Sequence, residues 1–315
     1  MGEKSFSRSP TPPLSRSLFM STPAIISHLT TRFHGPSAAP ADDLLAVEEP
    51  LEVRLQGQPI AVIMRTPGDD FELAAGFLVT EGILRSPSDV GAISYCKDAE
   101  PPNLENVVDV VLADGVPFDL ERLRRNVYAS SSCGICGKAT IEAIHAHAPP
   151  VAADFTLPPG LLYALPDRLR AAQSAFDRTG GLHAAGLFDL DGNLIVLRED
   201  VGRHNAVDKI VGHLLLRDLL PATDRQSDAD RRVLMVSGRA GFEIVQKALV
   251  ARIPVVAAVS APSSLAVDLA VESNMTLVGF LRGDRLNVYA GGHRLGLKNV
   301  DREPGTVNRK NQAPT

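Results

Sequence analysis

The feature that most constrains the fold of this chain is an alternation of short apolar runs and amphipathic stretches in its C-terminal half. Each run has four to six mainly apolar residues, which is too short for an ordinary helix. The pattern predicts strands at residues 233–236, 255–259, 276–281 and 286–289, and helices at 241–251 and 264–272. This order predicts an α/β architecture with strands buried on both faces of a sheet.

Two further sets of elements precede this alternation. Runs at 183–188 and 193–197 flank an Asp-Leu-Asp-Gly turn, which predicts a hairpin, and a helix is expected at 205–220. Earlier still, the pattern predicts two strands within 51–64, a helix from Asp69 or Asp70 to Thr80, and a strand at 107–112. We therefore expect a smaller N-terminal β/α subdomain at 46–150 and an α/β domain at 160–300, with a proline-rich linker between them at 149–159.

The two ends of the chain differ from the rest in composition. The first residues are rich in Ser, Pro and Arg and have little apolar periodicity, so 1–45 is predicted to be a disordered arm. The polar residues 301–315 are predicted to be a loose tail.

Composition narrows the class of protein. The chain has 315 residues, of which 44% are hydrophobic and 22% charged, as in ordinary globular proteins. Its net charge of −5 gives no sign of a nucleic-acid-binding protein, and it has no apolar stretch of membrane-spanning length. The cysteines number three, which does not suggest a disulfide framework, so a cytoplasmic location is expected.

Two of the three cysteines, Cys133 and Cys136, form a Cys-Gly-Ile-Cys motif. Three serines precede it and a predicted helix follows from Lys138. A helix N-terminus and a nearby cation both favour a thiolate over a thiol. The third cysteine, Cys96, is expected to be a buried residue at a strand end.

The motif allows four interpretations. A closed zinc site needs four ligands, and the chain has no second Cys-x-x-Cys. Inert packed thiols are disfavoured because Gly134 and Gly137 leave the backbone open. A thioredoxin-like redox pair and a persulfide relay both need a reactive, accessible thiolate, and the residues alone do not separate them.

Polar loops follow three successive predicted strands. They are Ser237-Gly238-Arg239, residues 260–264 and residues 282–285. Ligands of open α/β sheets gather at the carboxyl ends of strands, and helix N-termini with arginines suit phosphate. A polar segment at 199–209 and a histidine, His183, also stand out, although a solvated helix end and a structural histidine explain them equally well.

Taken together, these segments resemble the FdhD family. The resemblance rests on the cysteine motif, Thr-Gly-Gly-Leu-His at 179–183, the segment 199–209, Ser237-Gly238-Arg239, Phe242-Glu243, residues 260–265 and Gly-Phe-Leu-Arg at 279–282. These motifs occur in order between about residues 48 and 289.

The resemblance implies a cytidine-deaminase-like fold, with a mixed sheet flanked by helices, and a sulfurtransferase required for formate dehydrogenase activity. A cysteine desulfurase would load sulfur onto Cys133 as a persulfide, with Cys136 as relay or resolving partner. The sulfur would pass to a bis-molybdopterin guanine dinucleotide cofactor. The family's cofactor-binding stretch falls on Phe280, Leu281, Arg282, Gly283, Asp284 and Arg285. A homodimer is also implied.

From the loop residues themselves, Ser237, Arg239 and the helix start at Ser263 are expected to form a second phosphate cradle. Three rival functions stay open: a non-catalytic cofactor chaperone, a Cys-x-x-Cys zinc or redox protein, and a zinc-dependent deaminase. The last needs three ligands and a glutamate, and the sequence offers His204 with no glutamate two residues on.

Overall fold

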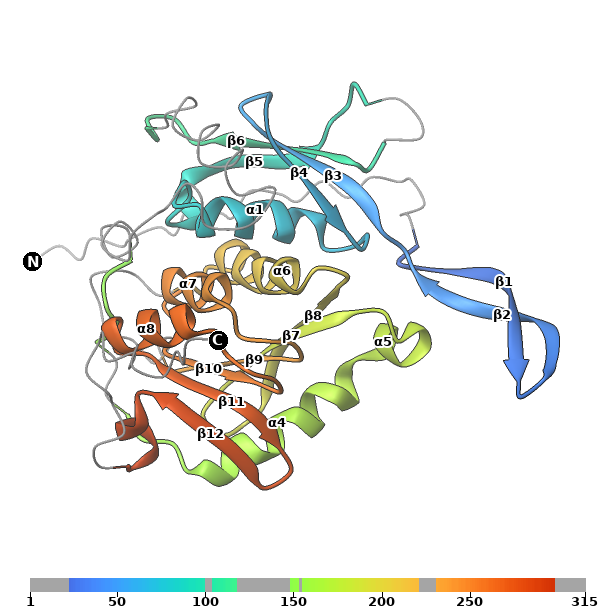
Figure 1. The fold of residues 1–315 in the computed structure, drawn as a ribbon. Helices are drawn as coiled ribbons and strands as arrows, with labels where there is room; N and C mark the ends of the chain where they lie inside the picture. Colours follow the sequence, from blue (N-terminus) through green and yellow to red (C-terminus); the bar gives the residue numbers. More distant parts are fainter. Residues whose placement is uncertain (1–22, 100–103, 118–147, 153–154, 221–230, 298–315) are drawn as a thin grey trace, which may run out of the picture.

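The computed structural model describes residues 23–99, 104–117, 148–152, 155–220 and 231–297. In these residues the chain forms two sheets with helices stacked between them, and a separate hairpin that projects to one side (Figure 1). Cys133, Cys136 and the predicted tail lie outside the described residues. Within the described ranges, no helix has both the length and the apolar character needed to cross a membrane.

The larger sheet has six strands in the order β12-β11-β10-β9-β7-β8. The strands are β7 (His183–Phe188), β8 (Leu194–Asp200), β9 (Val233–Val236), β10 (Val255–Ala258), β11 (Thr276–Arg282) and β12 (Arg285–Ala290). β9, β10 and β11 run parallel, whereas β12, β7 and β8 pair antiparallel with their neighbours. Every residue of β9 and β10 is buried. The α/β class and the mixed sheet are confirmed, and the likeness to cytidine deaminase stays a prediction.

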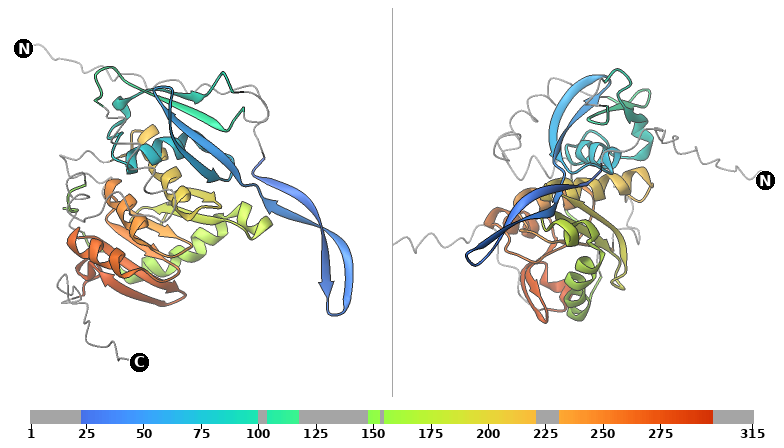
Figure 2. Two further views of the ribbon diagram at one scale, coloured as in Figure 1. Left: turned by 45° about the horizontal axis from the view of Figure 1, so that its top comes forward. Right: turned by 90° about the vertical axis from the view of Figure 1, so that its right-hand side faces the viewer.

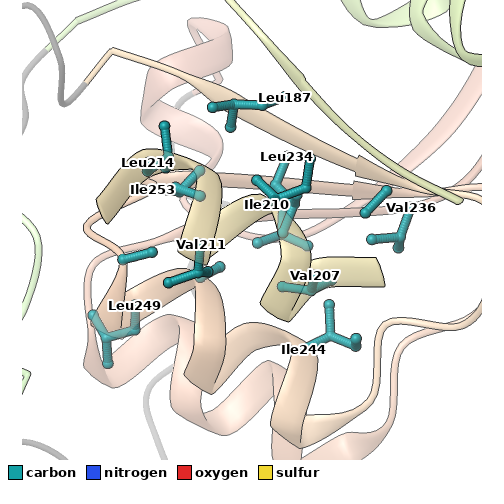
Figure 3. Close-up of a cluster of buried hydrophobic side chains, with 14 of the residues drawn as sticks. Leu187, Val207, Ile210, Val211, Leu214, Leu234, Val236, Ile244, Leu249 and Ile253 are labelled. Atoms are coloured by element: carbon teal, nitrogen blue, oxygen red, sulfur yellow. The ribbon is translucent and has the colours of Figure 1, made fainter. Parts of the chain in front are cut away.

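Helices cover both faces of this sheet (Figure 1). They are α4 (Pro159–Ala172), α5 (Ser174–Thr179), α6 (Arg203–Leu216), α7 (Phe242–Val250) and α8 (Ser264–Glu272), with a short 3-10 turn, η3 (Gly292–Leu295). α6, α7 and α8 lie on the face toward the smaller sheet, and α4 lies on the other. Figure 3 shows the apolar side of α6, including Val207 and Ile210, packed between α7 and the strands. Each such buried aliphatic side chain contributes roughly 1.5–3 kcal/mol.

The smaller sheet has four strands in the order β4-β3-β6-β5. Its elements are β3 (Glu49–Leu55), β4 (Gln58–Arg65), α1 (Asp70–Thr80), η1 (Pro87–Asp89), β5 (Val90–Tyr95) and β6 (Val107–Leu112). α1 covers one face of this sheet, and its other side packs on α6 of the larger domain. The predicted strands within 51–64, the helix to Thr80 and the strand at 107–112 are confirmed.

α1 and α6 meet backbone to backbone through two glycines. A Cβ added to Gly76 would lie 1.8 Å from the carbonyl oxygen of Asp208, and one added to Gly212 would lie 1.8 Å from that of Glu72. No side chain fits in either gap. The two glycines therefore set how closely α1 approaches α6.

The prediction of a disordered arm is wrong for residues 25–45. β1 (Ile25–His34) and β2 (Ser37–Ala46) pair in continuous antiparallel register around a tight turn at Gly35. The hairpin extends away from both sheets (Figure 2). The sequence pattern did not predict these two strands because many side chains of the hairpin are polar or small. Backbone hydrogen bonds hold the strands together, and these bonds need no alternation of apolar residues.

The described residues of the predicted linker lie against the part of the chain that forms the larger sheet. Val151 and Leu157 are buried, the Val151 N–H donates to the Ser273 carbonyl and the Leu157 N–H donates to the Arg294 carbonyl. This segment is therefore anchored at two points before α4 begins.

Candidate functional site

The three predicted loops meet at one edge of the larger sheet. β9, β10 and β11 are adjacent and parallel, so their carboxyl ends lie side by side. The Phe280 N–H donates to the Ser260 carbonyl (3.1 Å), and the Ser263 N–H donates to the Ala240 carbonyl (3.2 Å). These bonds tie the loop after β10 to both of its neighbours, which forms the predicted polar edge.

The segment 280–285 presents an aromatic ring and two arginines to solvent. Phe280 is 48% exposed although it is a large apolar residue, and its φ of +52° lies in the left-handed region at a bulge in β11. Arg282 and Arg285 are cross-strand partners on either side of the turn at Gly283 and Asp284, and all four are exposed. Backbone strain of this kind is concentrated at functional sites.

Leu281, predicted as a cofactor-binding residue, is fully buried in the core. Its side chain holds the end of β11 in place, so only its backbone can reach a ligand. Within 280–285, the side chains available for binding are Phe280, Arg282, Asp284 and Arg285.

The loop after β9 divides into a structural residue and an exposed cation. The Ser237 hydroxyl accepts a hydrogen bond from the Ala184 N–H (2.9 Å), and the Ser237 N–H donates to the Ala184 carbonyl. Ser237 therefore fixes β9 to β7, and only its hydroxyl proton is left for a ligand. Arg239 is exposed and makes no ion pair with another described residue.

The predicted cradle at Ser263 is used within its own helix. The Ser263 side chain accepts from the Ala266 N–H (3.3 Å) and so caps α8. This satisfies one of the free amide groups that an anion would need.

A group of basic side chains lies behind the loop after β9. It consists of His183 at the start of β7 and of Arg203 and His204 in the first turn of α6. Burial, then the charges of Lys247 and Arg203, lower the pKa of His204 to about 3, and its Nδ1 lies 3.1 Å from the Glu243 carboxylate. Burial and Arg203 also lower the pKa of His183. Both imidazoles are neutral at neutral pH.

Most of the polar residues in 199–209 hold the two parts of the molecule together. Asp200 pairs with Lys209 (2.8 Å), which also donates to the Thr66 carbonyl. Asp208 pairs with Lys247 (2.8 Å) and accepts from Thr80 of α1. A polar run at a helix start gave no sign that these residues are buried, because the residues that bury them come from elsewhere in the chain.

Cys96 directly follows β5, as expected for a strand end, but it is half-buried instead of buried. Its sulfur accepts a long hydrogen bond from Nη1 of Arg54 (3.6 Å). Among the described residues, His, Cys, Asp and Glu side chains do not gather in any group of three that could hold a metal ion.

Comparison with known proteins extends these observations. The FdhD/NarQ family model matches residues 46–296. A sulfur carrier protein FdhD of Streptomyces avermitilis is 58% identical over 265 residues, covering 81% of this chain and 90% of the relative. One of Anaeromyxobacter dehalogenans is 50% identical over 258 residues, covering 81% and 89%.

A solved structure agrees with the fold. A Desulfotalea psychrophila protein described as a formate dehydrogenase accessory protein superimposes with a TM-score of 0.66 at 27% identity, covering 87% of this chain and all of the other. The family match spans both sheets, the helices between them and the polar edge. This chain belongs to the FdhD/NarQ family.

Proposed function

We propose that this protein is a sulfur carrier required for formate dehydrogenase activity. It would accept sulfur from a cysteine desulfurase as a persulfide on Cys133 and pass it to a bis-molybdopterin guanine dinucleotide cofactor. The observation that carries this proposal is the family match, whose relatives bear the name sulfur carrier protein, in a chain with a Cys-x-x-Cys motif. Because both thiols must stay reduced between cycles, we place the reaction in the cytoplasm.

The polar edge supports a phosphate-bearing acceptor. Arg239, Arg282 and Arg285 are exposed and form no ion pair with another described residue. Arginine binds phosphate through paired N–H donors, and an exposed aromatic ring offers a surface on which a base stacks. Phe280 lies beside two of these arginines, so one edge offers contacts for both a guanine ring and its phosphates.

The two cysteines can carry the sulfur in two steps, and a thiol reductant then resets them. The Cys133 thiolate attacks the outer sulfur of the donor persulfide, the donor S–S bond breaks, and the donor cysteine leaves as a thiolate. In the second step, the Cys136 thiolate attacks the Cys133 sulfur. The outer sulfur then leaves as sulfide toward the acceptor, and the two cysteines are oxidised to a disulfide. A thiol reductant must reduce that disulfide before the next cycle.

The test is the intact mass of the full chain after incubation with a cysteine desulfurase and cysteine. We expect one added sulfur atom on the wild type and on Cys96→Ala, and none on Cys133→Ala. Zinc is assayed on the same sample. No added sulfur together with stoichiometric zinc would contradict the proposal and indicate a metal site.

Maturation of a formate dehydrogenase separates the carrier from a chaperone. Cys133→Ala should abolish the maturation activity, because the proposed persulfide forms on Cys133 and no sulfur would reach the acceptor without it. If a Cys133→Ala, Cys136→Ala double variant still matures the enzyme, the protein is a cofactor chaperone.

We also propose that the protein is a homodimer. The β1–β2 hairpin supports this, because its apolar side chains Leu29 and Phe33 are 69% and 70% exposed and do not pack on either sheet. A two-stranded hairpin is at best marginally stable alone in water, so a second surface that covers it would stabilise it.

A further inference from the structure

Arg203 is a cation without a counter-ion among the described residues. Its Nε is buried and has no hydrogen-bond partner. A buried guanidinium nitrogen left without a partner costs free energy, because it has lost water and gained nothing in return. An anionic ligand would supply a counter-ion for this guanidinium.

Three carboxylates of the segments around Arg203 have other hydrogen-bonding partners. Asp200 pairs with Lys209 and accepts from the Gly202 N–H and from Asn205. Glu199 accepts from two amide groups at the start of α5. The Glu243 carboxylate lies 3.1 Å from Nδ1 of the neutral His204, which is hydrogen-bonding distance. None of these three carboxylates forms an ion pair with Arg203.

Arg203 and His183 both lie beside Gly238, which has no side chain of its own to cover them. A Cβ added to Gly238 would lie 3.4 Å from Nδ1 of His183 and 3.9 Å from Cδ of Arg203. Gly238 sits between Ser237 and Arg239, at the carboxyl end of β9. Residues of three separate elements, β7, α6 and the loop after β9, therefore meet here.

We infer that Arg203 and His183 form an anion subsite over Gly238 that binds a phosphate group of the nucleotide part of the acceptor. The identity of the ligand in this inference rests on the proposed function. The arrangement of Arg203, His183 and Gly238 does not depend on that function. In this subsite Arg203 donates N–H bonds to phosphate oxygens, and the neutral His183 donates one from its protonated ring nitrogen. Arg239 lies next to Gly238 in the same loop and adds charge.

The subsite adds a contact that the sequence motifs did not assign. The loop at 280–285 lies two strands from Gly238, which is about 10 Å at the usual strand spacing. That span suits a nucleotide whose base lies near Phe280 and whose phosphates reach Arg203.

The experiment is calorimetric titration of the full-length protein with inorganic pyrophosphate, GDP and guanosine. Arg203→Gln should weaken the binding of pyrophosphate and of GDP about tenfold or more. A loss of this size is expected when one charge-assisted hydrogen bond to the ligand is removed. It should leave guanosine affinity unchanged, which a merely structural effect would not do. Arg203→Lys keeps the charge and should recover part of the loss.

Arg252→Gln is the matched control. Arg252 also has a buried Nε without a partner, but it follows α7, away from the carboxyl ends of the strands. Its removal should leave all three affinities unchanged. Gly238→Ala is a second variant that places a methyl group against His183 and Arg203 and should also weaken pyrophosphate binding, which keeps the test valid if Arg203→Gln fails to fold.

The outcomes separate the subsite from the proposed function. Pyrophosphate binding that depends on Arg203, without any binding of GDP, would support the subsite and count against a guanine nucleotide. GDP binding that is equal in wild type and Arg203→Gln would overturn the subsite and leave the proposed function standing. A wild-type protein that binds neither ligand would overturn the subsite as well.

Discussion

At the scale of single residues, position decides whether a polar or small side chain is structural or available to a ligand. Ser237 and Ser263 both lie in predicted anion loops, yet each hydroxyl accepts a hydrogen bond from the protein's own backbone. Arg203 lies in a segment full of ion pairs, yet it has no partner among the described residues. Gly76 and Gly212 have no side chain, and for this reason they allow the backbones of α1 and α6 to touch.

The glycine contact leads to a prediction about stability. Gly76→Ala should lower the free energy of unfolding by at least about 3 kcal/mol, because the added methyl group overlaps a backbone carbonyl that cannot move without shifting α6. Urea unfolding followed by circular dichroism measures the change. Gly160→Ala, in α4 with open space around it, should be neutral or slightly stabilising. Equal stability of Gly76→Ala and the wild type would show that the helices do not meet at this glycine.

At the scale of elements, the strand–helix pairs of the larger sheet each place one loop at the polar edge. β9, β10 and β11 end side by side, so the cations that follow β9 and β11 face the same region. The β1–β2 hairpin is the exception, because it carries exposed apolar side chains away from both sheets (Figure 2). Exposed apolar patches and unpaired strand edges mark surfaces of association.

The hairpin gives the second prediction. Leu29 and Phe33 lie four residues apart on one strand and so share a face. Changing both to serine should weaken self-association about tenfold or more, measured by sedimentation equilibrium, since a dimer would bury that face. Val62→Ser with Met64→Ser, on β4, removes two side chains that are also exposed and should have no such effect. A wild type that is monomeric at all concentrations would exclude the proposed dimer.

At the scale of the whole molecule, ionic contacts link α1, which packs on the smaller sheet, to β8 and α6. Glu72 of α1 binds Arg198 of β8 and His213 of α6, at 2.6 Å and 2.9 Å. Burial alone would raise the pKa of Glu72, but hydrogen bonds from His213 and Arg198 outweigh burial and lower it. The two parts are therefore coupled through a carboxylate that must be ionised.

This coupling predicts how stability depends on pH. Because the pKa of Glu72 is lower in the folded state, the unfolded chain binds more protons in acid. The stabilisation is complete above the ordinary value of about 4.5 and is lost as the pH falls below it. Unfolding free energies at pH 7 and pH 4 should therefore differ less in Glu72→Gln than in the wild type. Glu272→Gln, an exposed residue at the end of α8, should behave as the wild type. An unchanged pH dependence in Glu72→Gln would contradict the coupling.

The sequence by itself determined the elements whose signal is local. The alternation of apolar runs predicted β9 to β12, α7 and α8 to within two residues, because short buried strands and amphipathic helices follow from neighbouring side chains alone. It also placed the three loops at one edge, since parallel strands end on the same side. The family resemblance rested on the same local motifs and was confirmed.

The tertiary structure decided what depends on distant partners. The hairpin at Ile25–His34 and Ser37–Ala46 forms through backbone pairing that its side-chain pattern does not predict. The burial of Leu281 and the capping by Ser263 depend on where the polypeptide places them. His183, Arg203 and Gly238 meet only because β7, α6 and the loop after β9 bring together residues that are 20 to 55 positions apart. Periodicity reports the faces of single elements, whereas a site arises from contacts between elements, and those contacts are set by packing of the whole chain.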